Sequence, residues 1–295
     1  MIVGGSVTSP AMRSLGAIAR WPGLHAAAAV ARTHRGTMLA ASTGPLDATF
    51  AFASVTKVAT ALAVLVEVGE GRSALEDAAG PPGATLAHLL SHASGLPLDG
   101  TSSVAPPGAR RIYSNTGIEL AAAHAARRAG TTVPSLLHRN VVEPLDLSRT
   151  TLEGSAASGM VGTTEALCSL AAELLVPTLV TPELARRARA VQFGGLAGVL
   201  PGFGRQDPCD WGLGVEVKGT KQPHWTGATW PVATFGHFGQ AGGFVAVDAT
   251  AGLAVVTLGD TPFGSWATES WPGFTDDVRI EYLGAAAALD DETIA

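Results

Sequence analysis

The chain has 295 residues, of which 46% are hydrophobic and 15% are charged. This composition supports a sizeable buried core, so we exclude disorder and expect one large domain or two interleaved ones. The net charge of −6 argues against nucleic acid or an anionic membrane as the main partner. The paired arginines are interpreted as solvated faces and not as a basic stripe; the pairs are Arg110-Arg111, Arg127-Arg128 and Arg186-Arg187.

The N-terminal residues lack the basic start and the long apolar run of a secretory signal. The most apolar stretch, residues 58–66, is too short to cross a bilayer. We therefore expect a cytoplasmic protein, with export left open if a leader precedes this sequence. Cys168 and Cys209 are expected to be reduced structural thiols. No histidine spacing is typical of a metal site, and no metal or cofactor is expected.

In chain order, residues 24–41 predict a strand pair with a turn near His34-Arg35-Gly36. From residue 54 to about 190 the Ala/Leu-rich sequence has helical periodicity, interrupted by Gly and Pro. After about residue 202 strands return, at 213–218 and in an apolar hairpin of 243–247 and 253–258. A final helix is expected over residues 275–289.

These elements predict an α/β (α+β) fold, with one antiparallel sheet built from both termini, flanking helices and an inserted helical subdomain. The expected single domain, residues 1–295, has an α/β region of about 1–57 and 200–295. Its helical region then spans about 58–199.

Residues 55–66 contain a single charge, Lys57, and are apolar on nearly every face, which indicates a buried helix. Lys57 follows Ser54 by three residues and shares its helix face. Burial and the helix N-terminus would lower the pKa of Lys57 and make it a possible base toward the Ser54 hydroxyl. The alternative is that Ser54 only caps the helix and that Lys57 extends to solvent.

Two later segments carry further polar groups. Tyr113 and Asn115 follow a Pro/Gly loop, where a neighbouring ammonium would lower the pKa of the tyrosine for proton transfer. Asn115 can contact both Lys57 and a substrate amide. His237 lies between Gly236 and Gly239, where it can donate a hydrogen bond to a substrate carbonyl or carboxylate. The alternatives are a packing tyrosine, a turn and a structural histidine.

With its motifs in this order, the chain resembles the class C β-lactamase-related serine hydrolases. That family includes penicillin-binding-protein-type D-alanyl-D-alanine carboxypeptidases, D-aminopeptidases and β-lactamase-fold esterases. The resemblance extends from about residue 26 to residue 260 and implies the penicillin-recognising serine hydrolase fold. The segments that carry it are FASVTK at 52–57, LLSHASGLP at 89–97, PGARRIYSNTG at 107–117, EPLDL at 143–147, WGLG at 211–214 and GHFG at 236–239.

The resemblance implies Ser54 as the nucleophile, with Lys57 lowering the pKa of its hydroxyl. Tyr113 would be the general base and then the acid toward the leaving group. Asn115 and His237 would complete the catalytic set. The implied reaction is acyl transfer through a Ser54 ester to water or another nucleophile.

By the same resemblance, the backbone N–H groups of Ser54 and Gln240 would form the oxyanion hole. Phe238 and Gly239 would line the substrate cleft, and Trp225 would rim it or pack in the core. His237 lies where true class C β-lactamases usually have lysine, and Phe238 lies where the family often has Thr or Ser. Both differences favour neutral esters or amides over penicillins. His92, which also matches the family, is expected to form structural hydrogen bonds.

The expected function is hydrolysis of a small ester or amide, as an esterase, a D-amino-acid peptidase or amidase, or a β-lactam-related enzyme. An acyltransferase and a non-hydrolytic binding or sensor protein stay open as alternatives. The expected partner is a small-molecule ester, amide or D-peptide substrate. The sequence makes no prediction of the oligomeric state.

Overall fold

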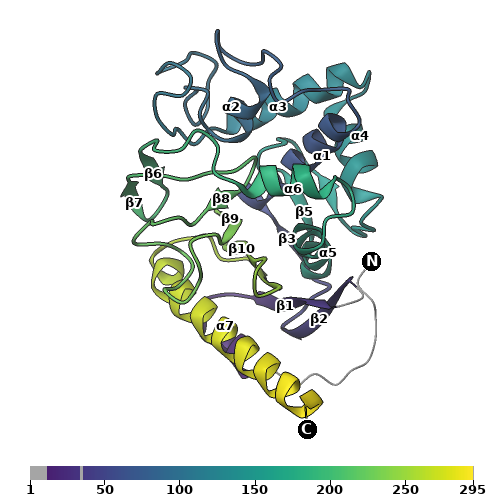
Figure 1. The fold of residues 1–295 in the computed structure, drawn as a ribbon, viewed down its shortest axis with the longest axis vertical. Coiled ribbons are helices and arrows are strands. Elements are labelled where there is room, and N and C mark those ends of the chain that lie inside the picture. Colours follow the sequence, from purple (N-terminus) through teal and green to yellow (C-terminus); the bar gives the residue numbers. More distant parts are fainter. Residues whose placement is uncertain (1–11, 34–35, 295) are drawn as a thin grey trace.

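The computed structural model describes residues 12–33 and 36–294, and Figure 1 shows their arrangement. The turn expected at His34-Arg35 and residues 1–11 lie outside the described residues. Strands from both ends of the sequence form one six-stranded antiparallel sheet, which confirms the predicted fold class. In spatial order the strands are β2 (Gly36–Thr43), β1 (His25–Thr33), β11 (Leu253–Gly259), β10 (Gly243–Asp248), β9 (Phe235–Gly239) and β8 (Glu216–Val217).

The intervening sequence is mainly helical, as expected. Its helices are η2 (Ala53–Val55), α1 (Thr56–Gly69), α2 (Leu86–Leu90), α3 (Asn115–Arg128), α4 (Val133–Leu137), η3 (His138–Val142), α5 (Thr164–Leu175) and α6 (Pro182–Arg189). Two small sheets were not predicted, because their strands have only two to four residues. They consist of β3 (Thr49–Ala51), β5 (Met160–Thr163) and β4 (Thr151–Leu152), and of β6 (Gly198–Leu200) and β7 (Gly204–Gln206).

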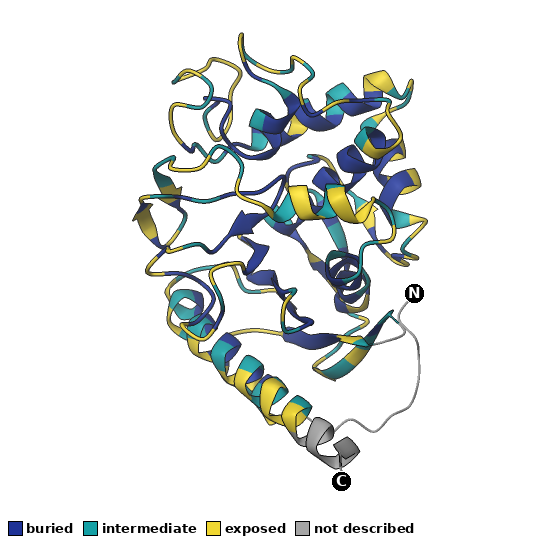
Figure 2. Cartoon of the chain, viewed as in Figure 1, coloured by how far each residue is buried: buried dark blue, intermediate teal, exposed yellow. Residues whose placement is uncertain are grey.

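The central strands are buried on both faces, so their alternate residues enter two different cores. In β1, Ala26, Ala28 and Val30 face one core, whereas Ala27 and Ala29 face the other. β10 and β11 alternate in the same way, and Figure 2 shows these strands as buried throughout. The sheet therefore separates two hydrophobic layers.

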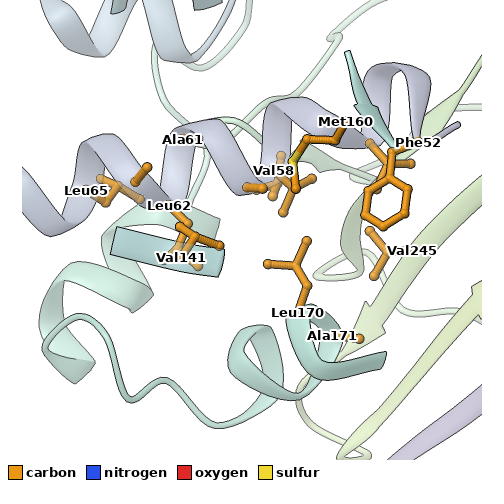
Figure 3. Packing of buried hydrophobic residues seen from close by; sticks show 14 of the residues in the cluster. Phe52, Val58, Ala61, Leu62, Leu65, Val141, Met160, Leu170, Ala171 and Val245 are labelled. Carbon is orange, nitrogen blue, oxygen red and sulfur yellow. The ribbon is translucent and has the colours of Figure 1, made fainter. Parts of the chain in front are cut away.

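The larger core lies between the sheet and helices α1 and α5. Residues 56–67 of α1 are all buried, which confirms the prediction of a helix without a solvent face. Figure 3 shows Val58 and Leu62 of α1 directed toward Leu170 of α5 and toward Val141, with Phe52 and Val245 close by. This packing fixes the first turn of α1, where Lys57 is placed.

The opposite face of the sheet is covered by η1 (Arg13–Arg20) and α7 (Ser265–Ile294). α7 begins ten residues before the predicted start of the final helix, at residue 275, and continues through Pro272. The sequence prediction missed this first part of the helix, in which Ala267 and Trp271 are fully buried against the sheet. Among the described residues, no helix is both long enough and apolar enough to cross a membrane.

Arg111 corrects one interpretation of the sequence, because its side chain is buried and not solvated. Its guanidinium donates hydrogen bonds to the carbonyl oxygens of Ser91 (2.6 Å), Gln192 (2.7 Å) and Cys209 (3.1 Å). These carbonyls belong to segments far apart in the sequence. Arg111 therefore connects the loop before α3 to the chain that leads into β8.

We predict that Arg111→Ala lowers the free energy of unfolding by about 3 kcal/mol or more, because several buried carbonyls lose their donor. Arg110→Ala is the matched control, since Arg110 is exposed, and it should change stability by less than about 0.5 kcal/mol. Urea unfolding of both variants measures the difference. Equal stability of the two variants would contradict the role of Arg111.

Candidate active site

Ser54 lies in η2, the short turn between β3 and α1. The preceding residue, Ala53, has a φ of 43°, a left-handed conformation that is costly for a residue with a side chain. Ser54 does not cap α1: the N-cap position is Val55, and no side chain caps this helix. The alternative of a purely capping serine is therefore contradicted, and the Ser54 hydroxyl is available for other contacts.

Lys57 is completely buried, so the alternative of a lysine extending to solvent is also contradicted. Its Nζ lies 3.0 Å from Ser54 Oγ, 2.7 Å from Asn115 Oδ1 and 2.8 Å from the carbonyl oxygen of Ala157. Burial lowers the pKa of Lys57 to about 7, and the charges of Glu119 and Asp99 oppose this shift only in part. Near neutral pH a large fraction of Lys57 is therefore uncharged.

The partners of Lys57 determine how a neutral amine is oriented. The Ala157 carbonyl can only accept a hydrogen bond. Asn115 must also accept through Oδ1, because its Nδ2 donates to Asp99 Oδ1 at 3.1 Å. A neutral lysine has two N–H groups, which these two acceptors occupy. Its lone pair then faces Ser54 Oγ, so the geometry suits proton transfer from Ser54 to Lys57.

Tyr113 lies on the other side of the Ser54 hydroxyl and shares a hydrogen bond with it. Burial raises the pKa of Tyr113, and the hydrogen bond with Ser54 opposes this rise only in part. The expected lowering of the pKa by the Lys57 ammonium is wrong, although Nζ lies 4.8 Å from the centre of the tyrosine ring. Tyr113 is therefore a neutral phenol that can relay a proton, and not a tyrosinate.

His237, on β9, lies at the far end of the hydrogen-bond network formed by Lys57, Ser54 and Tyr113. Its Nδ1 lies 2.6 Å from the carbonyl oxygen of Phe238, so Nδ1 carries the proton. Its Nε2 is then an acceptor that lies 3.3 Å from the Tyr113 hydroxyl, whose single proton can be donated either to Nε2 or to Ser54 Oγ. Burial, followed by the charge of Lys57, lowers the pKa of His237 to about 3. The expected hydrogen bond from His237 to a substrate is wrong, because neither ring nitrogen has an N–H to spare.

The segment with Tyr113 and Asn115 is held by the LLSHASGLP motif. The backbone N–H of Ser114 donates to His92 Nδ1 at 3.2 Å, and the Ser114 hydroxyl donates to the Pro97 carbonyl at 2.6 Å. The backbone N–H of Asn115 donates to the Leu98 carbonyl. His92 is fully buried and acts as the structural hydrogen-bonding residue that was expected.

The end of β9 lies directly against the nucleophile segment. A Cβ atom added at Gly239 would come within 2.4 Å of the Phe52 carbonyl oxygen and 3.3 Å of the Ser54 nitrogen. Only glycine permits this approach. Gln240 follows Gly239 and lines the same cavity as Ser54, so the two backbone N–H groups expected to form an oxyanion hole belong to adjoining segments.

Ser54, Tyr113 and His237 line a cavity of about 270 Å³. Its walls are mostly apolar or aromatic, and its lining residues are Ser54, Leu98, Tyr113, Asn115, Leu200, Pro201, Trp211, Glu216, His237, Phe238 and Gln240. The structure thus brings together all the catalytic residues predicted from the sequence: four of them line the cavity, and Lys57 lies beneath Ser54. Phe238 lines the cavity as expected.

Trp225 does not line the cavity, which corrects its expected position at the rim. The side chain is 1% exposed and packs against Phe238 and Phe244. Its indole N–H donates to Glu216. Burial on both sides of the ring leaves no surface for a substrate.

The sequence analysis missed Glu216, a buried carboxylate that lines the cavity. It forms an ion pair with Lys221 at 3.2 Å and a hydrogen bond with His224 Nε2 at 3.1 Å. Burial alone would raise the pKa of Glu216, but Lys221 and His224 outweigh it and lower the pKa to about 2. The only signal in the sequence was that Glu216, Lys221 and His224 lie within nine positions of one another. Among the described residues, no group of three or more His, Cys, Asp or Glu side chains could hold a metal ion.

Several solved structures share this fold. A beta-lactamase from Mycobacterium bovis is 43% identical to the chain, with a TM-score of 0.88 and coverage of 91% of this chain and 99% of that chain. A mutant of simvastatin synthase from Aspergillus terreus is 16% identical, with a TM-score of 0.73 and coverage of 92% and 93%. A beta-lactamase/D-alanine carboxypeptidase from Yersinia pestis is 18% identical, with a TM-score of 0.68 and coverage of 92% and 98%.

No curated protein matches the sequence. The Beta-lactamase family matches residues 22–271, which is most of the chain and includes all of the cavity described above. The likeness to the Mycobacterium bovis protein extends over nearly the whole of both chains. The chain therefore belongs to the Beta-lactamase family.

Proposed function

We propose that this protein is a serine hydrolase that forms an acyl-enzyme at Ser54 from a small, neutral ester or amide. One observation carries the proposal: a buried Lys57 with a pKa of about 7, whose lone pair faces the Ser54 hydroxyl. A nucleophilic serine needs such a neighbouring base, because its hydroxyl is unreactive at neutral pH.

In the proposed acylation step, neutral Lys57 takes the proton from the Ser54 hydroxyl while Oγ bonds to the substrate carbonyl carbon. The backbone N–H groups of Ser54 and Gln240 stabilise the resulting oxyanion. The bond to the leaving group then breaks, and the leaving group takes a proton from Tyr113. The Lys57 ammonium, whose Nζ lies 4.8 Å from the centre of the Tyr113 ring, then returns its proton to the Tyr113 oxygen. Water repeats these steps on the ester and releases the acid.

The charges around the cavity support a neutral group at the scissile bond. His237 is uncharged, because its pKa is about 3, and Phe238 offers no polar group. Glu216 adds a carboxylate that is neutralised by Lys221. Nothing in this lining attracts a carboxylate close to Ser54. The proposed substrate therefore has no carboxylate close to its scissile bond, whereas penicillins and D-Ala-D-Ala termini do have one.

Two other activities, β-lactam hydrolysis and acyl transfer, are alternatives to the hydrolysis of a neutral ester or amide. β-Lactam hydrolysis is favoured by the 43% identity to a protein described as a beta-lactamase. Acyl transfer is suggested by a structural neighbour described as a hydrolase with promiscuous acyltransferase activity. A chromogenic cephalosporin tests the first, and added alcohols or amines, with analysis of the products, test the second. We expect p-nitrophenyl esters to react faster than the cephalosporin.

The hydrolase proposal is tested with a fluorophosphonate probe and a series of p-nitrophenyl acyl esters. We expect labelling of Ser54, located by peptide mass spectrometry, and ester turnover that is lost in Ser54→Ala. Stable acylation without turnover would favour the binding or sensor alternative. A protein that is neither labelled at Ser54 nor active on any ester would refute the proposal.

The pH dependence follows from the charge of Lys57. Because the base must be neutral, kcat/KM for an ester should rise about tenfold per pH unit below pH 7 and level off above it. Tyr113, with a raised pKa, and His237, with a pKa of about 3, should not titrate near neutral pH. A profile that is flat or falls through this range would contradict Lys57 as the base.

We predict that Lys57→Ala and Tyr113→Phe each lower the acylation rate by about 10²- to 10⁴-fold. The step in the pH profile should disappear in Lys57→Ala and persist in Tyr113→Phe. The chain has one other tyrosine, Tyr282 on α7, and Tyr282→Phe is the matched control. Thermal melting checks that each variant is folded. Near-normal acylation in a folded Lys57 or Tyr113 variant would rule out the assigned role.

A further inference from the structure

A second and larger groove, of about 640 Å³, adjoins the catalytic cavity. Leu98, Tyr113 and Pro201 line both spaces, so the groove begins where the cavity opens beyond the tyrosine ring. One wall is formed by the chain between residues 97 and 113, and the other by β6, β7 and the residues next to them. Figure 1 shows β6 and β7 as a small hairpin at the edge of the molecule.

The groove has an apolar surface that is open to solvent. Leu98 is 50% exposed, Val104 is 55% exposed and Val199 is 63% exposed. Single exposed apolar residues are ordinary, but three of them gathered in one groove beside a catalytic cavity indicate a binding surface.

The groove is also cationic, although the whole chain has a net charge of −6. Arg110 and Arg205 line it, and none of the described residues that line it is acidic. Within residues 12–33 and 36–294, Arg110 has no ion-pair partner. Arg205 lies 3.4 Å from Asp207, but both side chains are well exposed, so this pair is weak. The third arginine, Arg111, is occupied by backbone carbonyls.

The two spaces therefore differ in charge. The catalytic cavity has a neutral His237 and a carboxylate, Glu216, that is neutralised by Lys221, whereas the groove has two guanidinium groups that can bind an anion. A substrate that fills both would place a neutral scissile bond at Ser54 and a negative charge at some distance from it. An apolar arm between the two would cross the surface formed by Leu98 and Val199.

We propose that this groove is a second substrate subsite, which binds a carboxylate at the end of an apolar arm of the ester or amide that acylates Ser54. This proposal rests on the proposed hydrolase function and names its substrate class: an acyl ester or amide with a remote acid group.

The test compares p-nitrophenyl half-esters of succinic to suberic acid with the same esters in which the free carboxyl group is methylated. The methylated compounds have the same chain and the same leaving group but no charge. A second series, phenyl acetates with a carboxyalkyl group or its methyl ester on the ring, places the acid on the leaving group. In one of the two series, we expect kcat/KM for the acid to be at least about fivefold higher than kcat/KM for its neutral match. Added salt should reduce this preference.

In the double variant Arg110→Gln/Arg205→Gln, the ratio of acid to neutral substrate should fall to about one, because both guanidinium groups are lost. Arg127→Gln, which removes an exposed arginine of α3 outside the groove, is the matched control and should keep the wild-type ratio. A double variant that keeps the preference, or a wild-type protein that lacks it in both series, would overturn the subsite.

Turnover of the neutral esters reports on the hydrolase function alone, so the two proposals can fail separately. Neutral esters that react without any acid preference would refute the subsite and leave the hydrolase intact. Calorimetric binding of monomethyl suberate to Ser54→Ala tests the groove without turnover. Binding that disappears with the two arginine substitutions supports the subsite even where no ester reacts, and the absence of binding overturns it.

Discussion

The site depends on one physical constraint: Lys57 is completely buried, and none of the described residues places a carboxylate within hydrogen-bonding distance of its amine. An ammonium without a counter-ion is costly in a packed interior, so the favoured response is loss of the proton. α1 imposes this position, because its residues 56–67 are buried by α3, α5 and the sheet. The packing that stabilises the fold is therefore also what makes a base out of Lys57.

The neighbouring groups follow the same constraint. Asn115 and the Ala157 carbonyl occupy the two N–H groups of the neutral amine, and Asp99 fixes the orientation of the Asn115 amide. Tyr113 and His237 continue the network as neutral groups, because burial disfavours the charged form of each. The result is a proton relay that develops charge only during the reaction. Such a site suits a neutral reacting group, while a charged part of the substrate must be bound elsewhere.

The sequence predicted the parts of this site that are local. The apolar residues around Lys57 indicated its burial, and the apolar stretches at 243–247 and 253–258 indicated the hairpin of β10 and β11. The rest depends on contacts between distant segments. The raised pKa of Tyr113 and the tautomer of His237 follow from burial and from a carbonyl that only the folded chain supplies. Arg111 looked like a surface residue, because its acceptors lie up to 98 positions away along the chain.

The central claim is that Lys57 is largely neutral when the enzyme acts, and its own titration tests this most directly. Nitrogen-15-labelled lysine allows the Nζ resonances to be followed by NMR between acidic and alkaline pH, with Lys57→Arg to assign the signal. We predict a midpoint near pH 7, well below that of an exposed lysine, which is about 10.4. A Lys57 signal that stays protonated to pH values typical of exposed lysines would contradict the account.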